Sequence, residues 1–448
     1  MTLEGISERP DASVPIDQGK SNPKSAWSST KLFAFRFAFA ISALSTFFMI
    51  GYLKDFVPPG KKRELVGAVV DHWDWYFRTI ASIGAFMIRT VTGGKWSIHD
   101  LVANYYFNYT PMLCLSFLLG HFILAVLIAI PWSLLDRHRG NYARLNAAMR
   151  VYTRYAIALS MLGFAMAKVI PNQFGTMTAA RMLRPFGQYA HTGVLWTFMA
   201  ASPGYTIFAG LVELTGSVLL FFRRTTLLGG LILAGALTNV EALDLGYRLG
   251  AGGDDAALLL MLDLIVLAPY LPGLFSVLLG TGQSRLPHEP LPVRQRWYHS
   301  VPAKATLLCL ALLPFLYNGS RVWRAQHRVG QVWGLYDVVT FMRNGRTVIA
   351  QASDGSTWWR VAGEAQWGAP KKTLWVQYAN GEMSRSPLFD DVGRSVWTSP
   401  PNSKPVTKLN YVVQTDGDVA LDGSIGTDTV HLLLHPVDMK KAFILLSR

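Results

Sequence analysis

Apolar runs long enough to cross a bilayer recur along the first 320 residues of this chain, and they limit its fold more than any other feature. A helix needs about 20 apolar residues to span a hydrocarbon core about 30 Å thick. Inside lipid the backbone must satisfy its own hydrogen bonds, so such runs form helices. The sequence therefore predicts an all-α polytopic membrane bundle over residues 31–320. The seven expected spans are 32–53, 111–131, 154–174, 203–224, 225–245, 254–279 and 302–318.

The basic residues lie mainly in the short loops between these runs. The chain has 42 Lys and Arg against 28 Asp and Glu, a net charge of +14. In a soluble protein that excess would suggest nucleic acid, but Lys- and Arg-rich loops are typical of the cytoplasmic side of membrane proteins. We therefore expect no nucleic-acid partner, contact with membrane lipid, and a plasma (bacterial inner) membrane location.

The same charges predict an orientation. The polar residues 1–30 are expected to form a disordered cytoplasmic leader. With seven spans, the C-terminal part then lies outside the cytoplasm. Lys61, Lys62 and Arg63 form a basic cluster that opposes this orientation.

Only two cysteines occur, Cys114 and Cys309, each inside an apolar run. They form no CxxC motif, and no group of cysteines and histidines has the spacing of metal ligands. The sequence thus predicts no metal site and excludes a disulfide relay like that of vitamin K epoxide reductases.

Residues 66–91 have apolar side chains three or four positions apart, with Asp71, Asp74, Arg78 and Arg89 between them. This pattern is typical of an amphipathic helix. We expect it to lie at the membrane interface rather than to span the bilayer.

After Arg321 the pattern changes to short alternating runs separated by turn dipeptides. Asn-Gly and Asp-Gly between such runs indicate tight β-hairpins. The tail, residues 330–448, is therefore predicted to be an all-β antiparallel barrel or sandwich of seven to nine strands that docks a protein partner. The dipeptides are Asn344-Gly345, Asp354-Gly355, Asn380-Gly381, Asp416-Gly417 and Asp422-Gly423.

Two of the spans carry a charge that a lipid-facing helix would avoid, Lys168 and Glu213. Small residues follow one face of each span, so these helices are expected to pack closely with their charges buried in protein. Position along the helices leaves two partners open for Lys168, namely Glu213 and Glu241. A buried pair of this kind could serve proton or quinone chemistry, or it could only hold the bundle together.

Two further titratable residues, His121 and Asp263, fall inside apolar runs. Both lie nine or ten residues from the outer end of their run, as Glu213 does, which corresponds to roughly 14–15 Å of depth. They are candidates for binding a quinone near mid-membrane, and equally for structural hydrogen bonding. In the loop at 172–202, Gln188 and Trp196 could contact a head group at the outer face, although Trp196 could also be an interfacial anchor.

The stretches MLGFAMAKV at 161–169 and TIFAGLVELTGSVLLFFRRTTLLGGLILAGALTNVEALD at 206–244 resemble the DoxX-like membrane proteins. The shared pattern is a small-residue helix ending in lysine, a Gly-x-x-Glu helix, a basic turn and two more spans. The resemblance covers about residues 150–280 and carries over Lys168 and Glu213 as site residues. It implies a membrane subunit associated with quinone-linked oxidoreductases, although other members of the family act in biogenesis and cargo handling. The segment after Thr238 departs from the larger relatives, so no ligand site is carried over there.

Two functions therefore follow from the sequence. The first is a membrane subunit serving quinone-linked electron transfer, with quinone as a possible cofactor. The alternative is a non-catalytic membrane scaffold or biogenesis factor that docks a partner through its C-terminal β domain.

Overall fold

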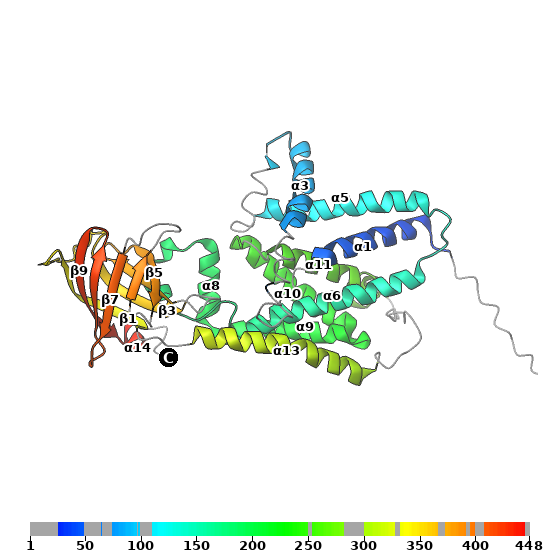
Figure 1. The fold of residues 1–448 in the computed structure, drawn as a ribbon. Coiled ribbons are helices and arrows are strands. Elements are labelled where there is room, and N and C mark those ends of the chain that lie inside the picture. The colour runs from blue at the N-terminus through cyan, green and yellow to red at the C-terminus, as the bar shows by residue number, and fades with distance from the viewer. Residues whose placement is uncertain are drawn as a thin grey trace, which may run out of the picture.

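The computed structural model describes residues 26–48, 64, 74–95, 97–98, 110–249, 253–281, 300–327, 332–365, 372–390, 395–398 and 407–443. Its first part is helical and its second part is a sheet (Figure 1). The helices are α1 (Ser29–Phe48), α3 (Asp74–Val91), α5 (Pro111–Leu135), α6 (Ala143–Val169), α7 (Ala179–Leu183), η3 (Phe186–Gln188), α8 (His191–Ala201), α9 (Pro203–Phe221), η4 (Arg223–Thr225), α10 (Thr226–Gly246), α11 (Gly253–Leu267), α12 (Leu271–Leu278), α13 (Val301–Gln326) and α14 (Met439–Ala442).

Four helical segments are long and apolar enough to cross a membrane, counted over the described residues. They are Pro111–Leu135, Pro203–Phe221, Arg223–Gly246 and Val301–Arg324. A fifth is added if α11 and α12, which are bent by 78° at their junction, count as one broken span. The seven expected spans are thus supported only in part. Helix α6 falls short because Arg154 and Lys168 bracket its apolar part, and the first expected span runs to Leu53, outside the described residues.

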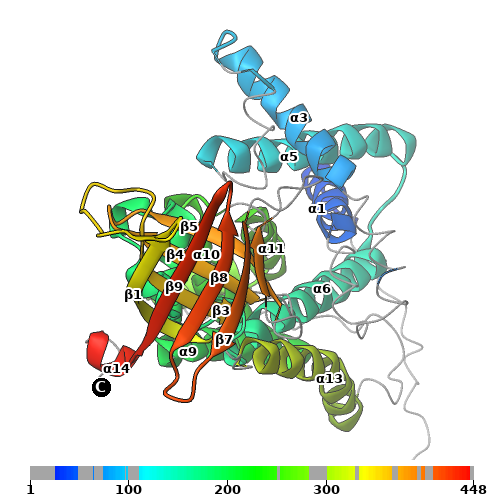
Figure 2. The same cartoon turned by 60° about the vertical axis from the view of Figure 1, so that its left-hand side comes forward.

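The helix predicted to be interfacial corresponds to α3, whose expected first residues, 66–73, lie outside the described residues. Figures 1 and 2 show α3 crossing α5 at a steep angle instead of running beside it. The crossing needs glycine on both helices. A Cβ on Gly84 would lie 1.8 Å from the Ser116 carbonyl oxygen, and a Cβ on Gly120 would lie 1.9 Å from that of Ile80.

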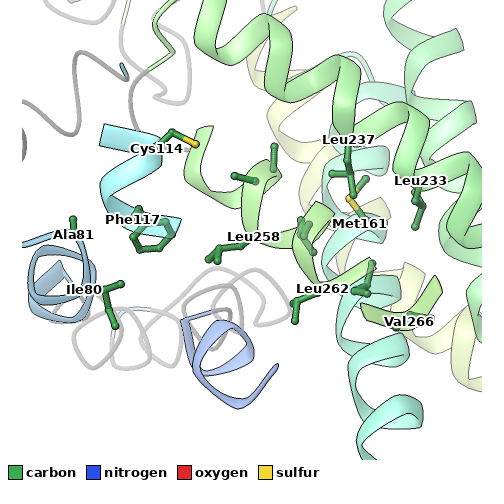
Figure 3. Packing of buried hydrophobic residues seen from close by; sticks show 14 of the residues in the cluster. Ile80, Ala81, Cys114, Phe117, Met161, Leu233, Leu237, Leu258, Leu262 and Val266 are labelled. Carbon is green, nitrogen blue, oxygen red and sulfur yellow. The ribbon is translucent and has the colours of Figure 1, made fainter. Parts of the chain in front are cut away.

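The core of the bundle is a cluster of apolar side chains from α3, α5, α6, α9, α10 and α11. In Figure 3, Met161 of α6 lies close to Leu237 of α10, and Leu258 of α11 faces Phe117 of α5. Helix α13 packs against the edge of this cluster through Leu308, and its Leu307, Leu310, Leu313 and Leu316 are exposed. In a spanning helix such side chains would contact lipid.

The tail forms nine antiparallel strands, within the predicted range of seven to nine. They are β1 (Gly334–Arg343), β2 (Arg346–Thr347), β3 (Trp358–Ala365), β4 (Lys372–Tyr378), β5 (Met383–Asp390), β6 (Ser395–Thr398), β7 (Thr407–Val413), β8 (Val419–Ile425) and β9 (Asp428–Val437). Each strand from β3 onward pairs with the next, and β1 pairs with β3 on one side and β9 on the other. The sheet therefore closes on itself as a small barrel. Its interior is filled by side chains such as Tyr411, Val361 and Leu432.

Three of the five predicted hairpin turns are correct: Asn344-Gly345, Asn380-Gly381 and Asp416-Gly417 each connect two strands that pair with each other. Asp354-Gly355 lies in the long connection between β2 and β3, which both pair with β1 and not with each other, so the prediction of a tight hairpin there was wrong. Asp422-Gly423 instead lies inside β8, where the prediction of a turn was wrong. A Cβ on Gly423 would lie 2.1 Å from the Lys408 carbonyl oxygen, so glycine is needed there for close approach to β7.

Candidate functional site

The first candidate site is an ion pair between α6 and α9. The Lys168 Nζ atom lies 2.8 Å from Glu213 Oε2, and the two side chains are only 8% and 3% exposed. Helix α9 approaches α6 closely because position 210 is glycine, whose added Cβ would lie 2.7 Å from the Lys168 Cβ. The Ser217 hydroxyl, two turns further along α9, donates to the Ala158 carbonyl of α6 at 2.7 Å. The predicted close contact of these two helices is therefore present, and Gly210 and Ser217 supply the small residues on α9. On α6 the predicted stripe does not face α9, because Gly163 packs against Phe315 of α13.

The structure also decides between the two partners left open for Lys168. Glu213 is the partner, and Glu241 instead accepts a hydrogen bond from the Cys114 thiol at 3.3 Å. Gly210 brings α9 close to the Lys168 Cβ, and Glu213 lies about one helical turn further along α9, within reach of the lysine side chain.

His121 and Asp263 are fully buried, but neither joins this pair. His121 Nδ1 contacts the Phe117 carbonyl at 3.0 Å, and its ring packs against the rings of Phe117 and Tyr76. Both carboxylate oxygens of Asp263 lack a hydrogen-bond partner among the described residues, and the backbone of Gly230 packs beside one of them. The described residues contain no group of three or more metal-ligating side chains.

The second candidate site is a cavity of about 480 Å³ between the loop after α6 and the outer face of the barrel. Figure 1 shows α8 in this position, between the bundle and the strands. One wall comes from α7, the following turn and α8, and the other comes from β3 and β4. The polar and aromatic lining residues are Arg181, Arg184, Tyr189, Trp196, Glu364 and Trp375.

Apolar contacts beside the cavity hold its two walls together. Ala179, Ala180 and Leu183 of α7 pack against Leu335 of β1 and Ala362 of β3. The Gln377 side chain donates to the Leu183 carbonyl at 3.2 Å. These barrel residues point outward because they alternate with interior residues along their strands.

The charged groups of the cavity come from opposite walls. The Arg184 guanidinium lies over the rings of Tyr189 and Trp375, at 5.3 and 4.7 Å from their centres. Arg181 donates to the Thr176 carbonyl at 3.1 Å. On the barrel side, Glu364 Oε1 accepts a hydrogen bond from the Trp375 indole at 2.7 Å.

Burial controls the charge of these groups. It raises the pKa of the Glu364 carboxyl above its usual range, and the Thr178 hydroxyl, the Trp375 indole and the two guanidiniums oppose that rise. Burial also lowers the pKa of Arg181, which the Glu364 charge opposes. The acid and the arginines therefore stabilise one another's charged forms across the cavity.

The sequence found this second site only in part. Trp196, one of the two candidates in the loop, lines the cavity. Gln188 does not line it and instead donates to the Gly381 carbonyl at 3.4 Å, which joins the loop to the barrel. Arg181, Arg184 and Glu364 were not predicted, because no spacing signal links residues about 180 positions apart in the chain.

Comparison with known proteins gives little further information. No family model and no solved structure matches the chain. Over 114 residues the chain is 29% identical to the uncharacterized protein YwoB of Bacillus subtilis (strain 168). That match covers 25% of this chain and 71% of YwoB.

The ion pair gives a testable prediction. Glu213→Gln keeps the shape of the side chain but leaves the Lys168 ammonium buried without a counter-charge, which should cost about 3 kcal/mol or more in unfolding free energy. Adding Lys168→Met removes both charges and should restore most of that stability. The measurement is membrane abundance and thermal unfolding in detergent for the two single variants and the double variant.

The matched control is Glu241→Gln, which removes the other candidate acid. Lys168→Met should not rescue any loss in this variant, because Glu241 is bonded to Cys114. A Glu213→Gln variant as stable as the unmodified protein would contradict a structural role for the pair.

Proposed function

We propose that this protein is a non-catalytic membrane scaffold or biogenesis factor that docks a protein partner through its C-terminal β barrel. One observation carries the proposal: two β-bulges in neighbouring strands aim apolar side chains outward. Register shifts occur between Val338 and Thr340 in β1 and between Trp358 and Arg360 in β3. The extra residues are Val339, 62% exposed, and Trp359, 49% exposed.

The two bulges are neighbours in space. The last paired residues of β1 and β3 are Asp337 and Arg360, which lie two positions before the extra residue in β1 and immediately after the extra residue in β3. Bulges re-aim side chains and are enriched at functional positions, and exposed tryptophan is enriched at protein interfaces. Ile349, in the connection between β2 and β3, adds a third exposed apolar side chain on this part of the domain.

The closed ion pair of the bundle supports the same function. Lys168 and Glu213 neutralise each other at 2.8 Å, as charges that only stabilise packing would. The contact between α7 and the barrel would hold the docking surface at a fixed place relative to the membrane.

In this proposal the chain has seven spans in a plasma (bacterial inner) membrane, with the N-terminus in the cytoplasm and the barrel outside. The basic loops support the orientation. The position of the elements supports it too, since the start of α1 lies beside the 136–142 loop and the barrel lies at the other end of the bundle (Figure 1).

A second candidate function is quinone-linked electron transfer, as the DoxX-like resemblance implies. One observation favours it: Asp263 is buried, and neither of its oxygens finds a hydrogen-bond donor within the described part of the chain. An ionisable group of this kind inside a membrane bundle commonly serves proton or ligand binding.

The orientation can be tested by labelling a single cysteine. In a background where Cys114 and Cys309 are replaced by alanine, Ser353→Cys places a thiol on an exposed loop of the barrel. It should react with a membrane-impermeant maleimide in intact cells. Reaction only after permeabilisation would place the barrel in the cytoplasm and refute the orientation.

The docking surface can be tested by photo-crosslinking in cells. A photoreactive phenylalanine analogue at Trp359 should give a discrete adduct, whereas the same analogue at Val412 of β7, which is similarly exposed, should give none. Trp359→Ala should lower the affinity for the partner, and with it the yield of an adduct formed from Val339, by about thirtyfold, since a central interface tryptophan often contributes about 2 kcal/mol or more. Equal adducts at Trp359 and Val412, or none at either position, would refute the proposal.

The second candidate function predicts bound quinone. Solvent extraction of the purified full-length protein should then release quinone in about equimolar amount, and Asp263→Asn should reduce that amount about tenfold. Thermal unfolding of this variant reports whether the fold is kept. Absence of quinone from the unmodified protein would refute this second candidate.

A further inference from the structure

The cavity between α7, α8 and the barrel has positive groups on one wall and a negative group on the other. Arg181 and Arg184 come from the helical part, and Glu364 comes from β3. Tyr189, Trp196 and Trp375 supply aromatic faces between them. A ligand that matches this lining carries an anion and a cation a few ångströms apart and is small enough for about 480 Å³.

We propose that this cavity binds the phosphoethanolamine head group of a phospholipid, with its phosphate at Arg181 and Arg184 and its ammonium at Glu364. This inference does not depend on the proposed docking function.

The arginine wall suits a phosphate. The Arg184 guanidinium is held over two aromatic rings and donates no hydrogen bond to any described residue, so its N–H groups remain available. Arg181 uses one nitrogen on the Thr176 carbonyl and keeps the others. Planar guanidinium groups bind phosphate oxygens through paired N–H donors.

The first turn of α8 adds donors on the same wall. Thr192 and Gly193 line the cavity at this turn. Ala190 precedes the helix and provides no side-chain cap, so the first backbone N–H groups of α8 are not satisfied by a capping side chain. Helix N-termini of this kind favour anions and reinforce the two arginines.

The barrel wall suits an ammonium group. With Oε1 of Glu364 bonded to the Trp375 indole, its Oε2 is buried and has no hydrogen-bond partner of good geometry among the described residues. Trp196 lines the same cavity, and indole rings attract cations. A ligand with phosphate alone would satisfy the arginines but would leave this carboxylate facing another negative charge.

Exposed aromatic residues near the cavity indicate that its ligand comes from the membrane. Phe198, on α8 itself, packs against Tyr205 of α9, and Tyr205 packs against Phe208. All three rings are exposed. Aromatic side chains gather at the level of lipid head groups, so the cavity lies at the depth where a head group would enter.

The test uses full-length protein, delipidated in detergent and given defined lipids, with bound lipid measured by native mass spectrometry. The unmodified protein should bind phosphatidylethanolamine in preference to phosphatidylglycerol and phosphatidylcholine. Arg184→Gln should weaken phosphatidylethanolamine binding about tenfold, since one charge-assisted contact is lost. The control Arg321→Gln, which changes an arginine that lies over Tyr317 on α13, should not weaken it.

Glu364→Gln is the decisive variant because it is nearly isosteric. It should remove the preference for phosphatidylethanolamine over phosphatidylglycerol while leaving binding of phosphatidylglycerol intact, a pattern that general unfolding cannot produce. An unchanged preference in this variant would overturn the proposal.

Soluble competitors distinguish the source of the ligand. Neither inorganic phosphate nor free phosphoethanolamine should displace the lipid at equal concentration. Displacement by free phosphoethanolamine would assign the site to a soluble metabolite, and displacement by phosphate would reduce it to an anion site. Either result would overturn the assignment to a phospholipid.

Discussion

The close contact between α6 and α9 is the constraint on which the rest of this structure depends. Gly210 lets the two helices approach until Lys168 reaches Glu213, and the pair then neutralises two charges inside the bundle. Lys168 lies in the last turn of α6, so the same contact fixes where the chain leaves the bundle toward α7. Helix α7 follows α6 in the chain and packs against β1 and β3. The contact between α6 and α9 therefore helps to fix the position of the barrel.

The buried polar groups divide into two kinds with different energetic consequences. Lys168 and Glu213 form a complete pair, so removing one member costs much more than removing both. Asp263 has no such partner among the described residues, so a ligand that brings a hydrogen-bond donor would lower the free-energy cost of its burial. Lys168 and Glu213 are therefore assigned to stabilising the bundle, and Asp263 is the candidate for any chemistry inside it.

Much of the architecture could be predicted from the sequence, because it depends on local patterns. Long apolar runs predicted the helical part, and Asn-Gly and Asp-Gly dipeptides predicted the hairpin connections β1–β2, β4–β5 and β7–β8. The prediction failed at Asp422-Gly423, where glycine serves contact between strands and not a turn, a distinction that needs the position of Lys408 in space. The sequence also left open whether Glu213 or Glu241 pairs with Lys168. The position of a residue along its helix does not show toward which neighbouring helix its side chain points. Glu364 was missed for a similar reason, because it lines the cavity only when β3 packs against α7.

The closure of the barrel has a consequence for how the protein is made. The first long strand, β1, pairs with β9 over most of its length, so the seam joins segments about 90 residues apart. Loop-closure entropy must be overcome before such a distant pairing gains any stability, which makes this step slow. During synthesis β1 emerges next to a finished membrane helix with one edge open until β9 arrives. That open edge of β1 is therefore prone to aggregation until the seam with β9 forms.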